Sequence, residues 1–150
     1  MAEDSLTILV VDDDTGHVEL VRRHLRRAGI ENPLEAIRDG EGALDYLDRQ
    51  GPRAGRANQL LILLDLNIAG NLDGFEVLRQ IKANRSTQRI PVIVLTTAND
   101  PRDVGRCYQL GCNLYVTKPV DPAAFSDCIE RLGMILSIAS LPAHGTESRP

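Results

Sequence analysis

Charged residues follow three short apolar segments of this chain, and their types suit the handling of a phosphoryl group. Asp12 and Asp13 follow one segment, Asp65 follows a second, and Lys118 follows a third. A carboxylate can accept a phosphoryl group as a nucleophile, a lysine ammonium suits phosphate, and Mg²⁺ prefers oxygen ligands. We therefore predict that Asp65 is the nucleophile and that Lys118 binds phosphate. Asp12 and Asp13 are expected to hold a metal ion together with Asp65.

The apolar segments have the length and composition of buried strands in a parallel sheet. Each is a short run of mostly apolar residues bounded by polar or turn residues. Stretches with apolar residues at helical spacing alternate with these runs, which predicts an α/β fold, a doubly wound five-stranded parallel sheet with five helices. The expected strands are 8–11, 34–37, 60–64, 92–95 and 114–117. Four of the expected helices begin at Asp14 or Thr15, at Asp73, at Asp100-Pro101 and near Pro122. The remaining one, second along the chain, is short and is expected to end at Gly51.

The carboxyl ends of these strands are where such a sheet binds a ligand. Ligands of open α/β sheets lie outside those ends, near the point where the strand order reverses, so the charged residues would share one crevice. Thr96 ends the fourth strand, where its hydroxyl could donate to a phosphate oxygen. Asn67 could offer its backbone carbonyl to a metal ion. Tyr115 has two interpretations, a switching role or a half-buried aromatic of the sheet.

Bulk composition argues against several classes of protein. The 150 residues are one domain's worth, and a net charge of −4 argues against DNA or an anionic membrane as the main partner. No apolar run is long enough to span a bilayer, and the acidic N-terminus is unlike a secretory signal. We expect a cytoplasmic protein whose cysteines, Cys107, Cys112 and Cys128, are reduced. No metal or acid-base role is expected for the histidines His17, His24 and His144.

Five short motifs, in their order along the chain, resemble the receiver domain of bacterial two-component response regulators. The resemblance covers about residues 5 to 136, and the ordered set is far more specific than any one motif. It implies a flavodoxin-like sheet with the strand order 2-1-3-4-5. The motifs are Val10-Val11-Asp12-Asp13, Leu63-Leu64-Asp65-Leu66-Asn67, Asp73-Gly74-Phe75, Val94-Leu95-Thr96-Thr97-Ala98 and Tyr115-Val116-Thr117-Lys118-Pro119.

The resemblance also implies a chemistry. A phosphoryl group would pass from the phosphohistidine of a sensor histidine kinase to Asp65 in a Mg²⁺-dependent reaction. The protein would then be a signalling protein that accepts the group, and not an enzyme. Thr96 and Lys118 would engage the phosphoryl group, and Tyr115 would report its arrival by changing rotamer. The implied metal ligands are Asp12, Asp13, Asp65 and the Asn67 carbonyl.

Within that family, the chain is similar to single-domain regulators paired with phytochrome-type, light-sensing kinases. The similarity lies in 64–67 and 110–118, in the long loop before the third strand, and in a C-terminal extension ending in Leu141-Pro142. Two features depart from the family pattern: Ala69 stands where proline is usual, and the loop between Asp65 and Asp73 has one residue more. Because this loop borders the metal site, we expect Mg²⁺ affinity or phosphoryl lifetime to differ.

The C-terminal part bears on how a signal would leave the protein. We expect a receiver domain over residues 5–141 with an extended last helix, a disordered tail over 142–150, and no effector domain. Residues 132–141 carry no charge and have apolar residues on more than one side, which favours a second buried surface. We therefore predict a homodimer built on the last helix, with a phosphotransfer protein as a candidate downstream partner.

A different function fits part of the pattern. Asp12-Asp13-Asp14 followed by Thr15-Gly16 resembles the Asp-x-Asp signature of haloacid-dehalogenase-type phosphatases. Asp12 would then be the nucleophile and Asp14 the acid-base, but Asp65 would go unexplained. A receiver used only for docking is a third interpretation, and it does not explain an intact acidic set. The aspartate that carries the phosphoryl group distinguishes the three.

Overall fold

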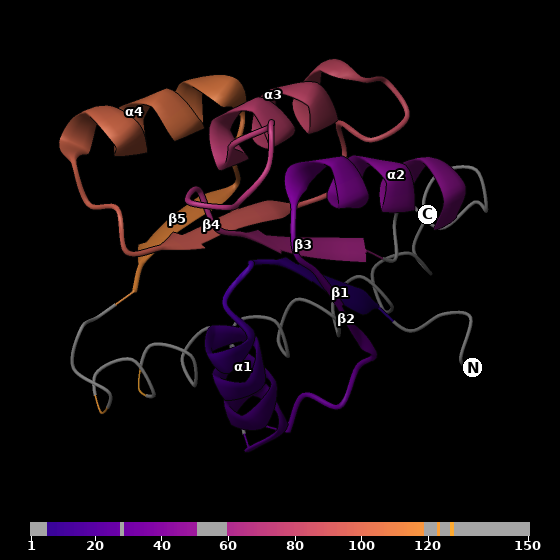
Figure 1. The fold of residues 1–150 in the computed structure, drawn as a ribbon, viewed down its shortest axis with the longest axis vertical. Helices are drawn as coiled ribbons and strands as arrows, with labels where there is room; N and C mark the ends of the chain where they lie inside the picture. The colour runs from indigo at the N-terminus through magenta and orange to yellow at the C-terminus, as the bar shows by residue number, and fades with distance from the viewer. Residues whose placement is uncertain (1–5, 28, 51–59, 119–122, 124–126, 128–150) are drawn as a thin grey trace, which may run out of the picture.

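A computed structural model describes residues 6–27, 29–50, 60–118, 123 and 127. In that part of the chain, strands and helices alternate (Figure 1). The strands are β1 (Thr7–Val11), β2 (Leu34–Ile37), β3 (Leu60–Leu64), β4 (Val92–Thr96) and β5 (Leu114–Thr117). The helices are α1 (Thr15–Arg27), α2 (Gly40–Gln50), α3 (Gly74–Ala83) and α4 (Pro101–Leu110). The fifth expected helix, Cys128 and the Lys118-Pro119 peptide bond lie outside the described residues.

The strands form one parallel sheet in the order β2-β1-β3-β4-β5, which confirms the predicted doubly wound, flavodoxin-like fold. β1, β3 and β4 are buried along their whole length, whereas β2 and β5 at the two edges are only partly covered. Continuous apolar runs therefore mark the central strands, as expected for a sheet covered on both faces.

In the part of the chain that the structure describes, helices cover both faces of the sheet. Figure 1 shows α2, α3 and α4 on one face and α1 on the other. Alternate residues of a strand point to opposite faces, so Leu9 and Val11 of β1 enter the α2–α4 core while Ile8 and Val10 enter the α1 core. The sheet is thus held rigidly between two apolar layers, with its carboxyl edge left to carry polar residues.

Local sequence decides where α3 and α4 begin and end. Asp73 and Asp100 are N-caps, as predicted, because their side chains accept hydrogen bonds of 2.9 Å from the N–H groups of Glu76 and Arg102. α4 ends at Gly111, whose φ of +106° lies in the left-handed region that favours glycine. These contacts are local, which explains why the pattern of residues predicted where both helices begin.

α4 has few apolar contacts with the sheet, and Cys107 is its one buried residue. Burial raises the pKa of the Cys107 thiol to about 12, and it also raises the pKa of the Cys112 thiol. Both cysteines are free, as expected of packed, reduced thiols. None of the described helices is both long and apolar enough to cross a membrane.

Candidate functional site

The register of the sheet brings Asp12 and Asp65 side by side. Val11 of β1 pairs with Leu64 of β3, so the next residue of each strand stands at the same level. The N–H of Asp65 continues the ladder by donating to the Val11 carbonyl at 3.0 Å. Asp12 is 5% exposed and Asp65 is 9% exposed. Two carboxylates therefore lie together at the carboxyl edge of the sheet, as predicted.

Lys118 reaches these two carboxylates from the end of β5. Its Nζ lies 2.8 Å from Asp12 Oδ2 and 3.4 Å from Asp65 Oδ2, and its side chain is 2% exposed. A buried carboxylate is costly unless it is paired with an opposite charge, so the ammonium offsets the cost of placing two acids together. Asp12, Asp65 and Lys118 are named the acid–lysine cluster below.

His17 is a member of the site that the sequence did not reveal. Its Nδ1 lies 3.2 Å from Lys118 Nζ, 3.4 Å from Asp14 Oδ2 and 4.0 Å from Asp12 Oδ2. An ammonium has three N–H groups, and His17 is the third partner of Lys118 beside the two carboxylates. Its position in the sequence could have indicated this. His17 is in the first turn of α1, and α1 begins at the carboxyl edge of the sheet because it directly follows β1.

Each carboxylate near the site accepts a backbone N–H, but from different places. Asp12 Oδ1 accepts from Asp14 N–H at 2.9 Å, and Asp65 Oδ1 accepts from Asn67 N–H at 3.2 Å. These are local contacts that Asp makes with the backbone two residues on. Asp13 differs, because its Oδ2 accepts the N–H of Ala69 at 3.0 Å, from a residue 56 positions away. Asp13 is thus held by the loop between β3 and α3.

The predicted metal ligands fit Mg²⁺ by chemistry, because all of them are oxygen donors. The structure places Asp12, Asp65 and the backbone of Asn67 together, with Asp13 beside them in contact with Ala69. Among the described residues, no three His, Cys, Asp or Glu side chains form a group that could hold a metal ion. The predicted oxygen donors are therefore present at this edge of the sheet, with the Asp13 carboxylate held by the N–H of Ala69.

Thr96 and Tyr115, the two predicted switch residues, converge on the backbone of Ala98. Thr96 is fully buried at the end of β4, and its hydroxyl oxygen accepts the N–H of Ala98 at 3.3 Å. The half-buried Tyr115 donates its hydroxyl to the Ala98 carbonyl, and burial raises the pKa of that hydroxyl to about 12. The Thr96 carbonyl also accepts the N–H of Lys118 at 2.6 Å. The loop between β4 and α4 is thereby tied to both residues and to the strand that carries Lys118.

Asp14 caps α1, which was one of the two starts expected for that helix. Its Oδ1 accepts the N–H of Gly16 at 2.9 Å and that of His17 at 3.2 Å. The hydrogen bond from the His17 N–H is the main reason that the pKa of Asp14 is lowered. A capping carboxylate with a lowered pKa is poorly suited to the general-acid role that the phosphatase interpretation required.

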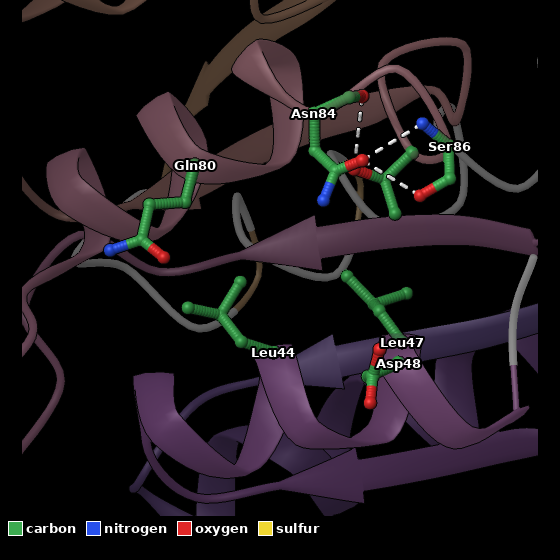
Figure 2. Close-up of a pocket in the computed structure, with 7 residues that line it drawn as sticks. Leu44, Leu47, Asp48, Gln80, Asn84 and Ser86 are labelled. Atoms are coloured by element: carbon green, nitrogen blue, oxygen red, sulfur yellow. Dashed lines mark hydrogen bonds between the residues drawn. The ribbon is translucent and has the colours of Figure 1, made fainter.

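One cavity lined by described residues lies away from these acids. Figure 2 shows it between α2 and α3, with a volume of about 500 Å³. None of the predicted site residues lines it; its lining residues are Leu44, Leu47, Asp48, Gln80, Asn84, Ser86 and Thr87. The charged chemistry of this protein therefore lies at the carboxyl edge of the sheet and not in this cavity.

Comparisons with known proteins agree with the geometry. A model of the response regulator receiver domain family matches residues 8–130. The response regulator Rcp1 of Synechocystis is 42% identical over 111 residues, which cover 74% of this chain and 75% of Rcp1. The structure of Rcp1 in its Mn²⁺-bound form superposes with a TM-score of 0.74 at 36% identity, covering 85% of this chain and 91% of that one.

Two further solved structures are similar over most of their length. A response regulator receiver domain from Rhodospirillum rubrum has a TM-score of 0.82 at 41% identity, covering 89% of this chain and 94% of that one. The phosphorylated cyanobacterial phytochrome response regulator RcpA has a TM-score of 0.76 at 32% identity, covering 85% and 91%. These matches give no support to the haloacid-dehalogenase alternative. The chain belongs to the response regulator receiver domain family, whose members are signalling proteins and not classical enzymes.

Proposed function

We propose that Asp65 accepts a phosphoryl group from the phosphohistidine of a sensor histidine kinase in a Mg²⁺-dependent reaction. The observation that carries this proposal is the acid–lysine cluster, in which the buried ammonium of Lys118 lies 3.4 Å from Asp65 Oδ2. A phosphoryl group on Asp65 would meet a positive charge already in place. The phosphorylated state of the relative RcpA supports the same chemistry.

The reaction would transfer one phosphoryl group from a nitrogen atom of the kinase to an oxygen atom of Asp65. The bond from the kinase histidine nitrogen to phosphorus breaks, the nitrogen keeps the electron pair, and an Asp65 carboxylate oxygen forms the new bond. Lys118 would donate to the phosphoryl oxygens. The residues that would hold Mg²⁺ are Asp12, Asp13, Asp65 and the Asn67 carbonyl. When bound, the cation would neutralise charge on the transferring group, and the Mn²⁺-bound form of Rcp1 supports a divalent cation.

The change in shape that follows would involve the loop at Ala98. A phosphoryl group on Asp65 would accept the O–H of Thr96 and draw the hydroxyl toward itself, away from the Ala98 N–H that the hydroxyl oxygen now accepts. Tyr115 would then change rotamer, because its hydroxyl is bound to the carbonyl of the same residue. α4 and β5 would present an altered face to a partner, which is a population shift between two packed states.

The partners are inferred from relatives and from the sequence. RcpA is a phytochrome response regulator, so we propose a bacteriophytochrome-type kinase as the donor. The receiver domain would cover 5–141 in the cytoplasm, act as a homodimer through its last helix, and pass its signal by contact or to a phosphotransfer protein. Light-dependent phosphotransfer from such a kinase would support the donor. A monomer in light scattering at tens of micromolar, with and without phosphorylation, would contradict the dimer.

The phosphoacceptor is tested by intact mass after incubation with acetyl phosphate and Mg²⁺. We expect one phosphoryl adduct on the wild type, none on Asp65→Asn, and none on any chain when the cation is chelated. Asp45→Asn is the matched control, because Asp45 is an exposed acid of α2 whose Oδ1 lies 3.3 Å from Nε of the exposed Arg49. It should carry the adduct like the wild type.

Other patterns of labelling would select a different function. An adduct that survives in Asp65→Asn and is lost in Asp12→Asn would favour the phosphatase chemistry. No adduct on any chain, with Mg²⁺ shown to bind, would leave docking as the function and contradict the proposal.

A further inference from the structure

The loop between β3 and α3 presents backbone N–H groups to carboxylates from two other parts of the chain. The N–H of Ala69 donates to Asp13 Oδ2 at 3.0 Å, and the N–H of Asn71 donates to Glu41 Oε2 at 3.1 Å. Ala69 also forms an isolated parallel bridge with Asp39, just before α2. The loop thus links an acid at the end of β1 to the start of α2.

Gly70 allows the chain to place both donors. Its φ is +102°, a conformation that side chains rarely adopt. A Cβ atom on Gly70 would lie 2.9 Å from Glu41 Oε1. The turn between the two N–H groups therefore depends on glycine, and the loop 69–71 is shaped around the carboxylates that it contacts.

Asp13 is the one acid of the site whose position depends on this loop. Asp12 and Asp65 are each held by an N–H two residues on and by Lys118. In the part of the chain that is described, no three acids form a group that could hold a cation. A cation held by Asp13 together with Asp12 and Asp65 would draw the Asp13 carboxylate away from the loop, and this movement would strain or break its hydrogen bond with Ala69.

We propose that the N–H of Ala69 competes with a divalent cation for the Asp13 carboxylate, so that cation binding releases the loop 69–71. This inference rests on the proposed function, because it requires the cation site at Asp13. An exposed hydrogen bond to a charged acceptor is worth about a fivefold change in an equilibrium constant. The cost of breaking it lowers the cation affinity by that factor and couples the site to α2.

The test removes the donor without removing the acid. Proline has no N–H, so Ala69→Pro should bind Mg²⁺ about fivefold more tightly than the wild type by calorimetric titration. Ala69→Ser is the matched control, because it keeps the N–H, and its affinity should equal that of the wild type. In the wild type, saturating Mg²⁺ should also speed hydrogen exchange of the Ala69 amide, whereas the Gly16 amide, which contacts Asp14, should not change.

Several outcomes would overturn the competition. Equal affinities for wild type and Ala69→Pro, or no change in exchange at Ala69, would show that the contact is irrelevant to the cation. Weaker binding by Ala69→Pro, with its circular dichroism and unfolding midpoint preserved, would show that the N–H orients Asp13 for the cation. Equal tightening in Ala69→Ser would assign the effect to the side chain. If the wild type binds no divalent cation, the proposed function fails together with this inference. If the wild type binds the cation and the Ala69 contact has no effect, only this inference fails.

Discussion

α3 and α4 both follow strands that end beside the acid–lysine cluster, but they are held very differently. α3 buries Val77, Leu78 and Ile81, and its first residue, Gly74, packs against the backbone of Asp65 and Leu66. α4 buries only Cys107. A helix with few buried apolar contacts opens at a lower free energy than one with many. The α4 side of the site is therefore the part that can move at small cost.

The loops that precede these helices show the same difference. The loop before α3 donates to the charged carboxylates of Asp13 and Glu41. The loop before α4 is held at Ala98 by the neutral hydroxyls of Thr96 and Tyr115. Hydrogen bonds to charged groups are about twice as strong as neutral ones. The loop before α3 is thus held by stronger hydrogen bonds than the loop before α4, so the α4 side of the site gives way at the smaller cost.

The largest expected effect comes from a comparison in which one glycine in each helix is replaced by alanine. A Cβ on Gly74 would lie 2.6 Å from the Asp65 carbonyl oxygen and would also meet Leu66 Cα, both of them backbone atoms that cannot turn aside. Gly74→Ala should lower the free energy of unfolding by about 3 kcal/mol. Urea denaturation measures the change.

Gly105→Ala in α4 is the control, because among the described residues no atom outside its chain neighbours and the backbone of its own helix lies within 4 Å of a Cβ at that position. It should stabilise the protein by about 0.5–1 kcal/mol, since alanine is the better helix former. Similar changes of one sign in both variants would contradict the contrast between the helices.

The next largest effect is expected when the ionic contact between Lys118 and the two buried carboxylates is removed. Lys118→Met leaves Asp12 and Asp65 buried together without their ammonium, and we expect a loss of about 2 kcal/mol in the free energy of unfolding. Adding Asp65→Asn to the same chain removes the repulsion and should restore part of that loss. If the two changes were simply additive in the double-mutant cycle, the contact would carry no stability.

A smaller effect tests the neutral bonds on the α4 side. Tyr115→Phe removes one hydroxyl from the Ala98 carbonyl and should cost about 1 kcal/mol, with faster amide exchange in 97–100 but not in 69–71. Tyr108→Phe is the matched control: the hydroxyl of Tyr108 accepts the Tyr115 N–H at 3.1 Å, and Tyr108 is 47% exposed. Equal losses in both variants would deny the Ala98 contact a special role.

The same tyrosine predicts a dependence on alkaline pH. Burial raises the pKa of Tyr115 to about 12 from its usual 10.0. The fold therefore favours the protonated hydroxyl, and this contribution to stability is complete below pH 10 and is lost as the pH rises through 12. The unfolding midpoint of Tyr115→Phe should fall less than that of the wild type over this range. Parallel curves would contradict the assignment.

The smallest effect belongs to an exposed pair on α3. Glu76 has its pKa lowered to about 2, first by the side-chain hydrogen bond from Arg79. The contribution of ionised Glu76 to stability is present above pH 4.5, the usual pKa of the group, and is lost as the pH falls through 2. Because both groups are exposed and screened by water, Glu76→Gln should leave the unfolding midpoint at pH 7 unchanged within error. A large drop at pH 7 would mean that α3 is held by charge and not by its apolar face.

Much of this protein was determined by the sequence alone, because the forces involved act over a few residues. Continuous apolar runs predicted the central strands, and capping acids such as Asp73 and Asp100 predicted where helices begin. Parallel strands place their carboxyl ends at one edge, so the meeting of Asp12, Asp65 and Lys118 also followed from the sequence.

The backbone groups and neighbours that complete the site could not be predicted, because they meet only in the packed fold. The turn of α1 brings His17 to Lys118, the end of β5 brings Tyr115 to Ala98, and the loop at Ala69 reaches Asp13 across 56 positions. Backbone N–H and carbonyl groups are present in almost every residue, so residue type does not mark the ones that bond at long range. Their partners are chosen by strand register and loop shape, which form only when the whole sheet packs.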